Sequence, residues 1–142
     1  METDKRPLVM VVDDPLIADV MAQMLEDAGM RSISACGLQE AEKAYQAHKD
    51  EISLLIIDDM CGKGAYESAD EEAGMKLILN LSDTGPLKAR VIFISSWLPG
   101  PNARKLFRDV SGNDILDKPF GKKELLAAVE DVFSKPLPDF VS

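Results

Sequence analysis

The sequence has only two cysteines and no long apolar run. Cys36 and Cys61 have neither the spacing of a metal-binding motif nor the number needed for a disulfide framework. This favours a reducing, cytoplasmic setting. The longest apolar runs have the length of a strand, far short of the roughly 20 residues of a membrane span, and Met1–Pro7 lacks the apolar segment of a signal peptide. We therefore expect a soluble cytoplasmic protein without a membrane partner.

An excess of basic residues is also missing. The 142 residues carry 25 acidic and 16 basic side chains, which gives a net charge of −9. Nucleic-acid binding needs clustered Lys and Arg to neutralise phosphates, so this charge argues against direct contact with nucleic acid. The 46% content of hydrophobic residues is sufficient for one buried core. We expect a single domain over 1–142, with a core at about 8–133 and a tail at 134–142.

Apolar segments of strand length alternate with segments of helical periodicity. The predicted strands are Val9–Val12, Arg31–Cys36, Ile52–Ile57, Arg90–Ile94 and Asp114–Leu116. The predicted helices begin at Pro15, at Leu38, near Ala69 (after a capping box at Ser68–Glu71), around Leu106 and at Lys122. This alternation is typical of repeated βαβ units, and it predicts an α/β fold with a parallel sheet.

The first predicted helix carries an apolar stripe at helical spacing. Pro15 suits the first turn of this helix, and Gly29 provides a stop. The stripe consists of Leu16, Ile17, Val20, Met21, Met24 and Leu25.

Several predicted strands end in a side chain that can do chemistry. Asp13 and Asp14 follow the first strand, Asp58 the third and Ser95 the fourth, while Lys118 comes just after the last. In an open parallel α/β sheet, functional groups gather outside the carboxyl ends of the strands. We therefore expect these residues to converge on one edge, where they could hold a divalent metal and a phosphoryl group.

The three carboxylates of this set favour a magnesium site. Like charges about 4 Å apart repel by roughly 4 kcal/mol per pair at an effective dielectric constant near 20. Mg²⁺ removes that repulsion, and it prefers oxygen ligands together with phosphate oxygens. A carboxylate can also attack phosphorus to give an aspartyl phosphate. Asp58 is the best candidate because it ends the most buried strand, and strand alternation would turn its competitor Asp59 away.

With these residues in place, the chain resembles the receiver domain of two-component response regulators over Leu8 to about Phe133. The resemblance implies a flavodoxin-like (CheY-like) doubly wound sheet of five parallel strands, in the order 2-1-3-4-5, with five helices. It implies phosphoryl transfer to Asp58 from a sensor histidine kinase or a histidine phosphotransfer protein. The phosphorylated form would then bind a downstream protein partner or output domain, with a homodimer as a further possibility.

The same resemblance assigns the other site residues. Magnesium would bind Asp13, Asp14, Asp58 and the backbone carbonyl of Met60. Ser95 and Lys118 would contact phosphoryl oxygens, because positioning and charge neutralisation supply most of the catalysis in phosphoryl transfer. Lys118 also opens a Lys-Pro-Phe signature, and the family implies that its bond to the following proline is cis.

Three departures from the family pattern stand out. Pro15 follows Asp14 directly, so the first connection is one residue short and either aspartate could be the direct metal ligand. The connection between Asp58 and Gly74 is longer than usual. Ser95 and Ile115 occupy the switch positions, and Ile115 replaces the usual aromatic residue with a β-branched one.

These features leave three functions to compare. The favoured one is a phosphorylation switch, which is not an enzyme in the usual sense although it may catalyse its own dephosphorylation. The alternative is a degenerate pseudo-receiver that binds protein independently of phosphorylation. A magnesium-dependent phosphohydrolase would need a second acid two residues after the nucleophile, where Met60 stands.

Overall fold

Five parallel strands form the centre of the molecule. The computed structural model describes residues 6–58, 73–83, 87, 89–95, 105, 108–109 and 115–135. Within them the strands pair in the order β2-β1-β3-β4-β5, which confirms the predicted doubly wound topology. Their bounds are β1 Leu8–Val12, β2 Arg31–Ala35, β3 Ile52–Asp58, β4 Arg90–Ser95 and β5 Leu116–Asp117.

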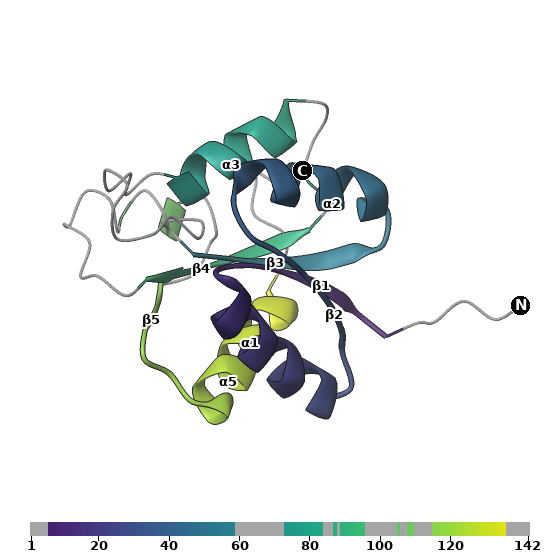
Figure 1. Cartoon of the computed structure of the whole chain (residues 1–142). Helices are drawn as coiled ribbons and strands as arrows, with labels where there is room; N and C mark the ends of the chain where they lie inside the picture. Colours follow the sequence, from purple (N-terminus) through teal and green to yellow (C-terminus); the bar gives the residue numbers. More distant parts are fainter. Residues whose placement is uncertain are drawn as a thin grey trace, which may run out of the picture.

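Helices cover both faces of this sheet. Those with both ends among the described residues are α1 Pro15–Asp27, α2 Leu38–His48, α3 Ala73–Ser82 and α5 Lys122–Ser134. Figure 1 shows α2 and α3 on one face and α1 and α5 on the other. No helix in the described part of the chain is both long and apolar enough to cross a bilayer.

Some predicted features fall outside the described residues. Of the predicted fourth helix, Lys105, Arg108 and Asp109 are helical, and the rest, including Leu106, is not described. The long connection at 59–72, with its predicted capping box and the predicted helix start near Ala69, also lies outside, as does the tail from 136 onward.

The strand interiors explain why the sheet is the core of the molecule. Every residue of β1 is buried, because successive side chains point to opposite faces and both faces are covered. Met10 and Val12 pack in the cluster that includes α2 and α3 side chains. Val9 and Val11 pack in the cluster that includes α1 and α5 side chains.

Helix α1 begins and ends as predicted, but its apolar stripe is only partly buried. Pro15 occupies the start of the helix, and Gly29, with φ +87°, follows its end. Met21 and Leu25 are buried, whereas Leu16 is 73% exposed and Val20 is 48% exposed. The stripe is wider than the surface that the sheet can cover, so its outer edge faces solvent.

The last strand is shorter and later than predicted. The expected span was Asp114–Leu116, but β5 contains only Leu116 and Asp117, which pair with Ile94 and Ser95 of β4. Asp114 lies outside the described residues, and Ile115 precedes the strand. The ends of an element are its least sharply determined part, and here the strand is displaced from the prediction by one to two residues.

The amino end of β4 is tied to the end of α5. The guanidinium carbon of Arg90 lies 5.6 Å from the centre of the Phe133 ring, within the range of a cation–π contact. The Nη2 atom of Arg90 also donates a hydrogen bond of 3.1 Å to the backbone carbonyl of Lys135. These contacts fix where α5 leaves the sheet.

Candidate functional site

Three polar side chains are buried in the described part of the molecule, and all three stand at the carboxyl ends of strands. Asp13 is 1% exposed, Asp58 is 7% exposed and Ser95 is fully buried. Asp13 directly follows β1, Asp58 ends β3 and Ser95 ends β4. These three strands are neighbours in the sheet. The strand order therefore brings residues from distant parts of the sequence to one edge.

Lys118 connects the two buried carboxylates. Its Nζ atom lies 2.7 Å from Asp13 Oδ2 and 3.2 Å from Asp58 Oδ2, and its side chain is 17% exposed. The backbone N–H of Lys118 donates a 2.7 Å hydrogen bond to the carbonyl of Ser95. Its bond to Pro119 is cis, as the resemblance implied. One cation thus bridges β1 and β3 while its own backbone is held to β4.

Burial controls the electrostatics of this cluster. Burial raises the pKa of the Asp13 carboxyl group from its ordinary 3.8 to about 6; the hydrogen bond from Lys118 lowers this pKa, and the charge of Asp58 raises it. For Lys118, burial alone would lower the pKa. The hydrogen bond to Asp13 and the charges of both aspartates outweigh burial, so the pKa of Lys118 is raised. The lysine therefore stays charged at neutral pH.

Asp14 does not join the cluster. Its Oδ1 atom accepts a 3.1 Å hydrogen bond from the backbone N–H of Ile17 and so caps helix α1. No group of three or more metal-ligating side chains occurs among the described residues. Met60, the other predicted ligand, lies outside those residues.

Ile115, the predicted switch position, is part of the core. It is 5% exposed and packs in the cluster that contains α2 and α3 side chains. An aliphatic side chain at this depth offers no ring to move between a buried and an exposed position.

The two buried carboxylates nevertheless fit a magnesium ion. Mg²⁺ is usually bound through one or two carboxylates, waters and phosphate oxygens rather than by a full set of protein ligands. Asp13 and Asp58 supply such a pair at a site from which water is largely removed. The raised pKa of Asp13 shows that its negative charge is under-compensated by Lys118 alone. A second cation at these oxygens would correct that imbalance.

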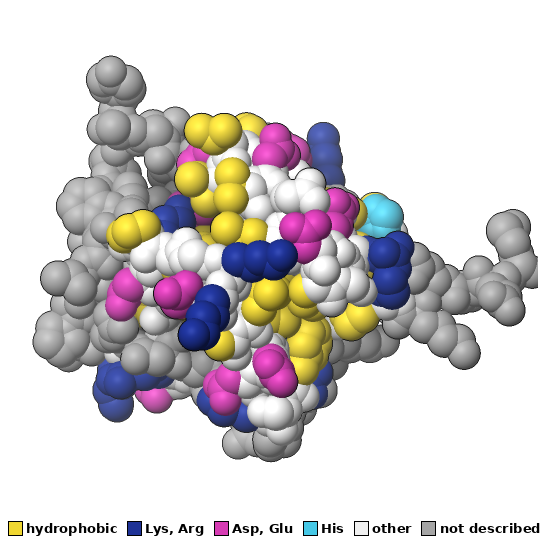
Figure 2. All heavy atoms as spheres, turned by 90° about the horizontal axis from the view of Figure 1, so that it is seen from below, with side chains coloured by type: hydrophobic (Ala, Val, Ile, Leu, Met, Phe, Trp, Pro, Cys, Tyr) yellow, Lys and Arg dark blue, Asp and Glu magenta, His cyan; other side chains and the backbone are white. Residues whose placement is uncertain are grey.

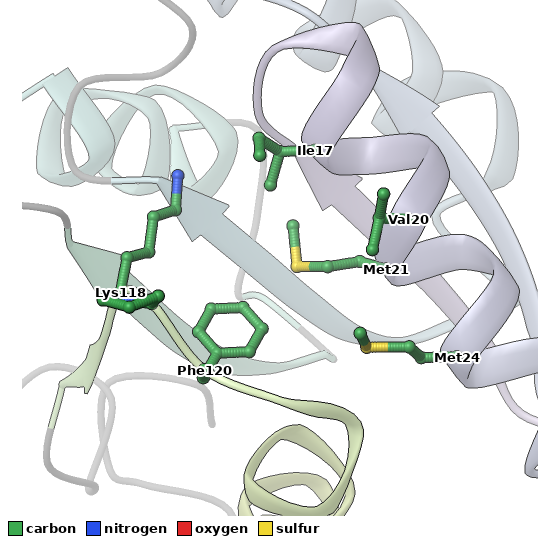
Figure 3. Close-up of a pocket in the computed structure, with 7 residues that line it drawn as sticks. Ile17, Val20, Met21, Met24, Lys118 and Phe120 are labelled. Carbon is green, nitrogen blue, oxygen red and sulfur yellow. The ribbon is translucent and has the colours of Figure 1, made fainter.

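An apolar groove opens beside the cluster. It has a volume of about 190 Å³ and runs between α1 and the Lys118–Phe120 segment. Its α1 wall consists of Ile17, Val20, Met21 and Met24. Figure 3 shows the ring of Phe120 facing the methionines across the groove, while the side chain of Lys118 extends away from the ring. All four residues of this wall belong to the predicted apolar stripe, but the sequence does not show that they line a groove.

Known proteins share the fold described above. The family model of the response regulator receiver domain matches residues 8–130. The chain belongs to this family. No curated protein sequence matches this chain significantly.

Solved structures share the fold of this receiver domain. A response regulator from Thermotoga maritima is 25% identical, with a TM-score of 0.73, over 92% of this chain and 99% of the other. A response regulator receiver protein from Pseudomonas putida is 27% identical, with a TM-score of 0.67, over 91% and 99% of the two chains. A chain of the CheX–CheY–BeF3–Mg²⁺ complex from Borrelia burgdorferi is 25% identical, with a TM-score of 0.70, over 91% and 90%.

Proposed function

We propose that this receiver domain accepts a phosphoryl group on Asp58 in an Mg²⁺-dependent reaction, and that the modification changes its affinity for a downstream partner. The donor is a phosphohistidine on a sensor kinase or a histidine phosphotransfer protein, encountered in the cytoplasm. The domain acts as a stoichiometric acceptor in this reaction. Removal of the phosphoryl group at its own site is part of the same proposal.

The observation that carries this proposal is the bridge made by Lys118. A phosphoryl acceptor needs a carboxylate oxygen that is partly accessible. It also needs a positioned cation that lies close enough to interact with the phosphoryl oxygens after transfer. Asp58 is the less deeply buried of the two bridged carboxylates, and its oxygen lies 3.2 Å from Lys118 Nζ. Asp13 holds the same ammonium group at 2.7 Å from the other side. The cation is therefore positioned before the donor arrives.

The transfer itself requires one bond to form and one to break. An oxygen of Asp58 bonds to phosphorus as the P–N bond of the donor breaks, and the bonding electrons return to the histidine ring. The product is an acyl phosphate on Asp58. Lys118 and the hydroxyl of Ser95 are proposed to bind phosphoryl oxygens. Asp13 and Asp58 would hold Mg²⁺, with the backbone carbonyl of Met60 as a predicted further ligand, and the ion would supply positive charge beside the transferred group.

Intact-mass spectrometry after incubation with acetyl phosphate tests the proposal directly. The protein should gain the mass of one phosphoryl group when Mg²⁺ is present and none when EDTA is added. Asp58→Asn should gain nothing, whereas Asp59→Asn, the matched control one residue away, should behave like the unmodified protein. Labelling that persists in Asp58→Asn, or that ignores Mg²⁺, would contradict the assignment.

The groove beside Lys118 is the proposed docking place for the protein donor. Figure 2 looks onto the face formed by α1 and α5, where hydrophobic side chains gather between acidic and basic ones. The partly exposed Val20 lines this groove, and Lys118 joins it to the acceptor edge. A donor helix that covers these apolar side chains would bring its phosphohistidine to Asp58 while burying area that the domain itself leaves exposed.

One observation favours a second function. Ile115 is a buried aliphatic residue at a switch position, which suits a binding module whose surface does not respond to phosphorylation. In that case a folded protein would take up no phosphoryl group from acetyl phosphate. The mass measurement therefore separates the two functions.

A further inference from the structure

A second apolar groove lies at the amino end of the sheet, opposite to the edge that carries Asp58. It has a volume of about 460 Å³ and is bordered by Pro7, which directly precedes β1. One wall is the turn after α1, which includes Met30, and the other wall is one face of α5. Met30 is only half-buried, so the groove leaves apolar surface open to solvent.

The groove exists because α5 extends beyond the end of α1. Lys122 is the first residue of α5, and its Nζ atom lies 3.4 Å from Oδ2 of Asp27, the last residue of α1. Further along α5, Leu126, Val129 and Phe133 line the groove at helical spacing. Leu126 and Phe133 are half-buried. The second half of α5 thus carries an apolar stripe that α1 does not cover.

The chain leaves α5 beside this groove. Phe133 lines the groove, and the helix ends one residue later at Ser134. Lys135 has an extended backbone, with φ −97° and ψ 154°, as expected for a residue that precedes proline. Pro136 and Pro138 disfavour a continuation of the helix. The sequence after Lys135 therefore predicts a change of direction at the end of α5.

The seven residues after Lys135 have a composition that suits an apolar groove. Residues 136–142 include Leu137, Phe140 and Val141, besides two prolines. The other terminal segment that adjoins the groove, residues 1–5, has Met1 as its one apolar residue. Of the two ends of this chain, only the carboxyl-terminal segment offers several apolar side chains.

The same segment is long enough to reach the far end of the groove. Leu126 precedes Phe133 by seven residues, which corresponds to about 10 Å along a helix. Seven extended residues span at most about 23 Å. The segment can therefore reverse after Lys135 and run back along α5 as far as Leu126.

We propose that residues 136–142 occupy this groove in the same chain, with the ring of Phe140 against Met30 and Leu126. Burial of an aromatic ring against two partly exposed apolar side chains provides the favourable free energy. The contact joins the carboxyl-terminal segment to the turn after α1. It lies at the other end of the sheet from Asp58, so this proposal is independent of the proposed function.

Nuclear magnetic resonance of the full, unphosphorylated chain tests the proposal. We expect nuclear Overhauser contacts between the ring protons of Phe140 and the methyl groups of Met30 and Leu126. Phe140→Ser should remove these contacts and shift the backbone amide signals of Met30 and Leu126. Asp139→Asn, the matched control one residue away, keeps every apolar side chain and should leave those amide signals in place.

Three outcomes would overturn the proposal, and unshifted amide signals of β1 and β3 show that each variant is folded. If Phe140→Ser leaves the Met30 and Leu126 signals unchanged, the segment does not occupy the groove. If the shifts fall on α2 and α3 instead, the segment binds the other face of the sheet. If the contacts disappear on tenfold dilution, the occupant belongs to a second copy, because dilution does not change the effective concentration within one chain. None of these outcomes affects the proposed function, which the mass measurement tests separately.

Discussion

The interior of the sheet and its carboxyl edge are built on opposite principles. In the interior, residues such as Ile56 and Ile92 are apolar and almost completely buried between two helical layers. At the edge, two carboxylates are also buried, with Asp13 1% exposed and Asp58 7% exposed. Burial of an apolar side chain stabilises the fold, but burial of a carboxylate opposes its ionisation. The interior is thus arranged for stability, whereas the edge holds carboxylates whose ionisation is opposed by burial.

The raised pKa of Asp13 reflects the opposition between burial and ionisation of its carboxyl group. Lys118 contacts the carboxylate at 2.7 Å, and yet the pKa of Asp13 stays at about 6 because burial is the larger effect. No comparable cost exists a few residues earlier in β1, where every side chain is apolar.

The largest effect is expected in the interior. Ile56→Ala removes a fully buried side chain from β3, which is paired with β1 on one side and β4 on the other. We expect a loss of about 2–5 kcal/mol in the free energy of unfolding, measured by urea denaturation. Leu79→Ala is the control, because this side chain is 51% exposed. A similar loss in both variants would show that the interior is not specially stabilising.

Bound Mg²⁺ should offset the unfavourable burial of carboxylate charge at the carboxyl edge of the sheet. At a concentration 100 times its dissociation constant, a ligand that binds only the folded state raises the free energy of unfolding by about 2.7 kcal/mol. We expect the thermal midpoint of the unmodified protein to rise with added MgCl2, and that of Asp13→Asn to change little. An equal rise in both proteins would place the bound metal elsewhere.

Asp13→Asn should itself stabilise the protein in EDTA at pH 8. The ionised carboxylate is disfavoured in the folded state even with Lys118 present. A neutral amide of the same shape removes the cost of burying this charge, while Lys118 keeps Asp58 as its partner. A destabilised variant at pH 8 would mean that the ion pair with Lys118 outweighs the burial of the charge.

The pKa of Asp13 determines the direction in which the free energy of unfolding changes with pH. The pKa of Asp13 is about 6 in the folded state and ordinarily 3.8, so the folded state binds this proton more tightly than the unfolded chain does. The stability that protonation provides is fully present below about pH 4 and is lost as the pH rises through about 6. Urea denaturation of the unmodified protein and Asp13→Asn over this range should therefore give curves that converge at low pH.

The smallest effect on stability is expected at the exposed edge of α1. Val20→Lys should change the free energy of unfolding by no more than about 0.5 kcal/mol, as is usual for surface substitutions. Phosphorylation by acetyl phosphate should be unchanged. Phosphotransfer from a histidine kinase that phosphorylates the unmodified protein should be slower, because the groove no longer accepts an apolar helix. Leu79→Lys, on α3 at the opposite face, is the matched control.

The resemblance to receiver domains implied the strand order. The sequence itself predicted that Asp13, Asp58 and Ser95 lie at one edge, because each follows directly on an apolar strand and parallel strands end at a common edge. It did not predict which aspartate faces that edge. In a two-residue connection, the choice depends on the backbone geometry that Pro15 imposes on Asp14, and adjacent identical residues carry no signal of it. The sequence pattern alone left both aspartates as candidates.

The sequence also did not predict that Leu16 and Val20 are exposed. Helical periodicity identifies an apolar stripe, but the width that becomes buried depends on the neighbours that pack against it. On α1 these neighbours are the sheet and α5, and they cover Met21 and Leu25. The remaining apolar edge is a surface, and only the three-dimensional arrangement distinguishes it from core.

The contacts of Arg90 with Phe133 and Lys135 join the amino end of β4 to the end of α5. Arg90 and Ser95 are the first and last residues of β4, which separates them by about 17 Å at the usual rise per residue of a strand. Lys135, held by Arg90, therefore sits a full strand length from the edge that carries Asp58. The Arg90–Lys135 contact and the carboxylate of Asp58 therefore lie at opposite ends of the sheet, and a partner that touches both must span about one strand length, roughly 17 Å.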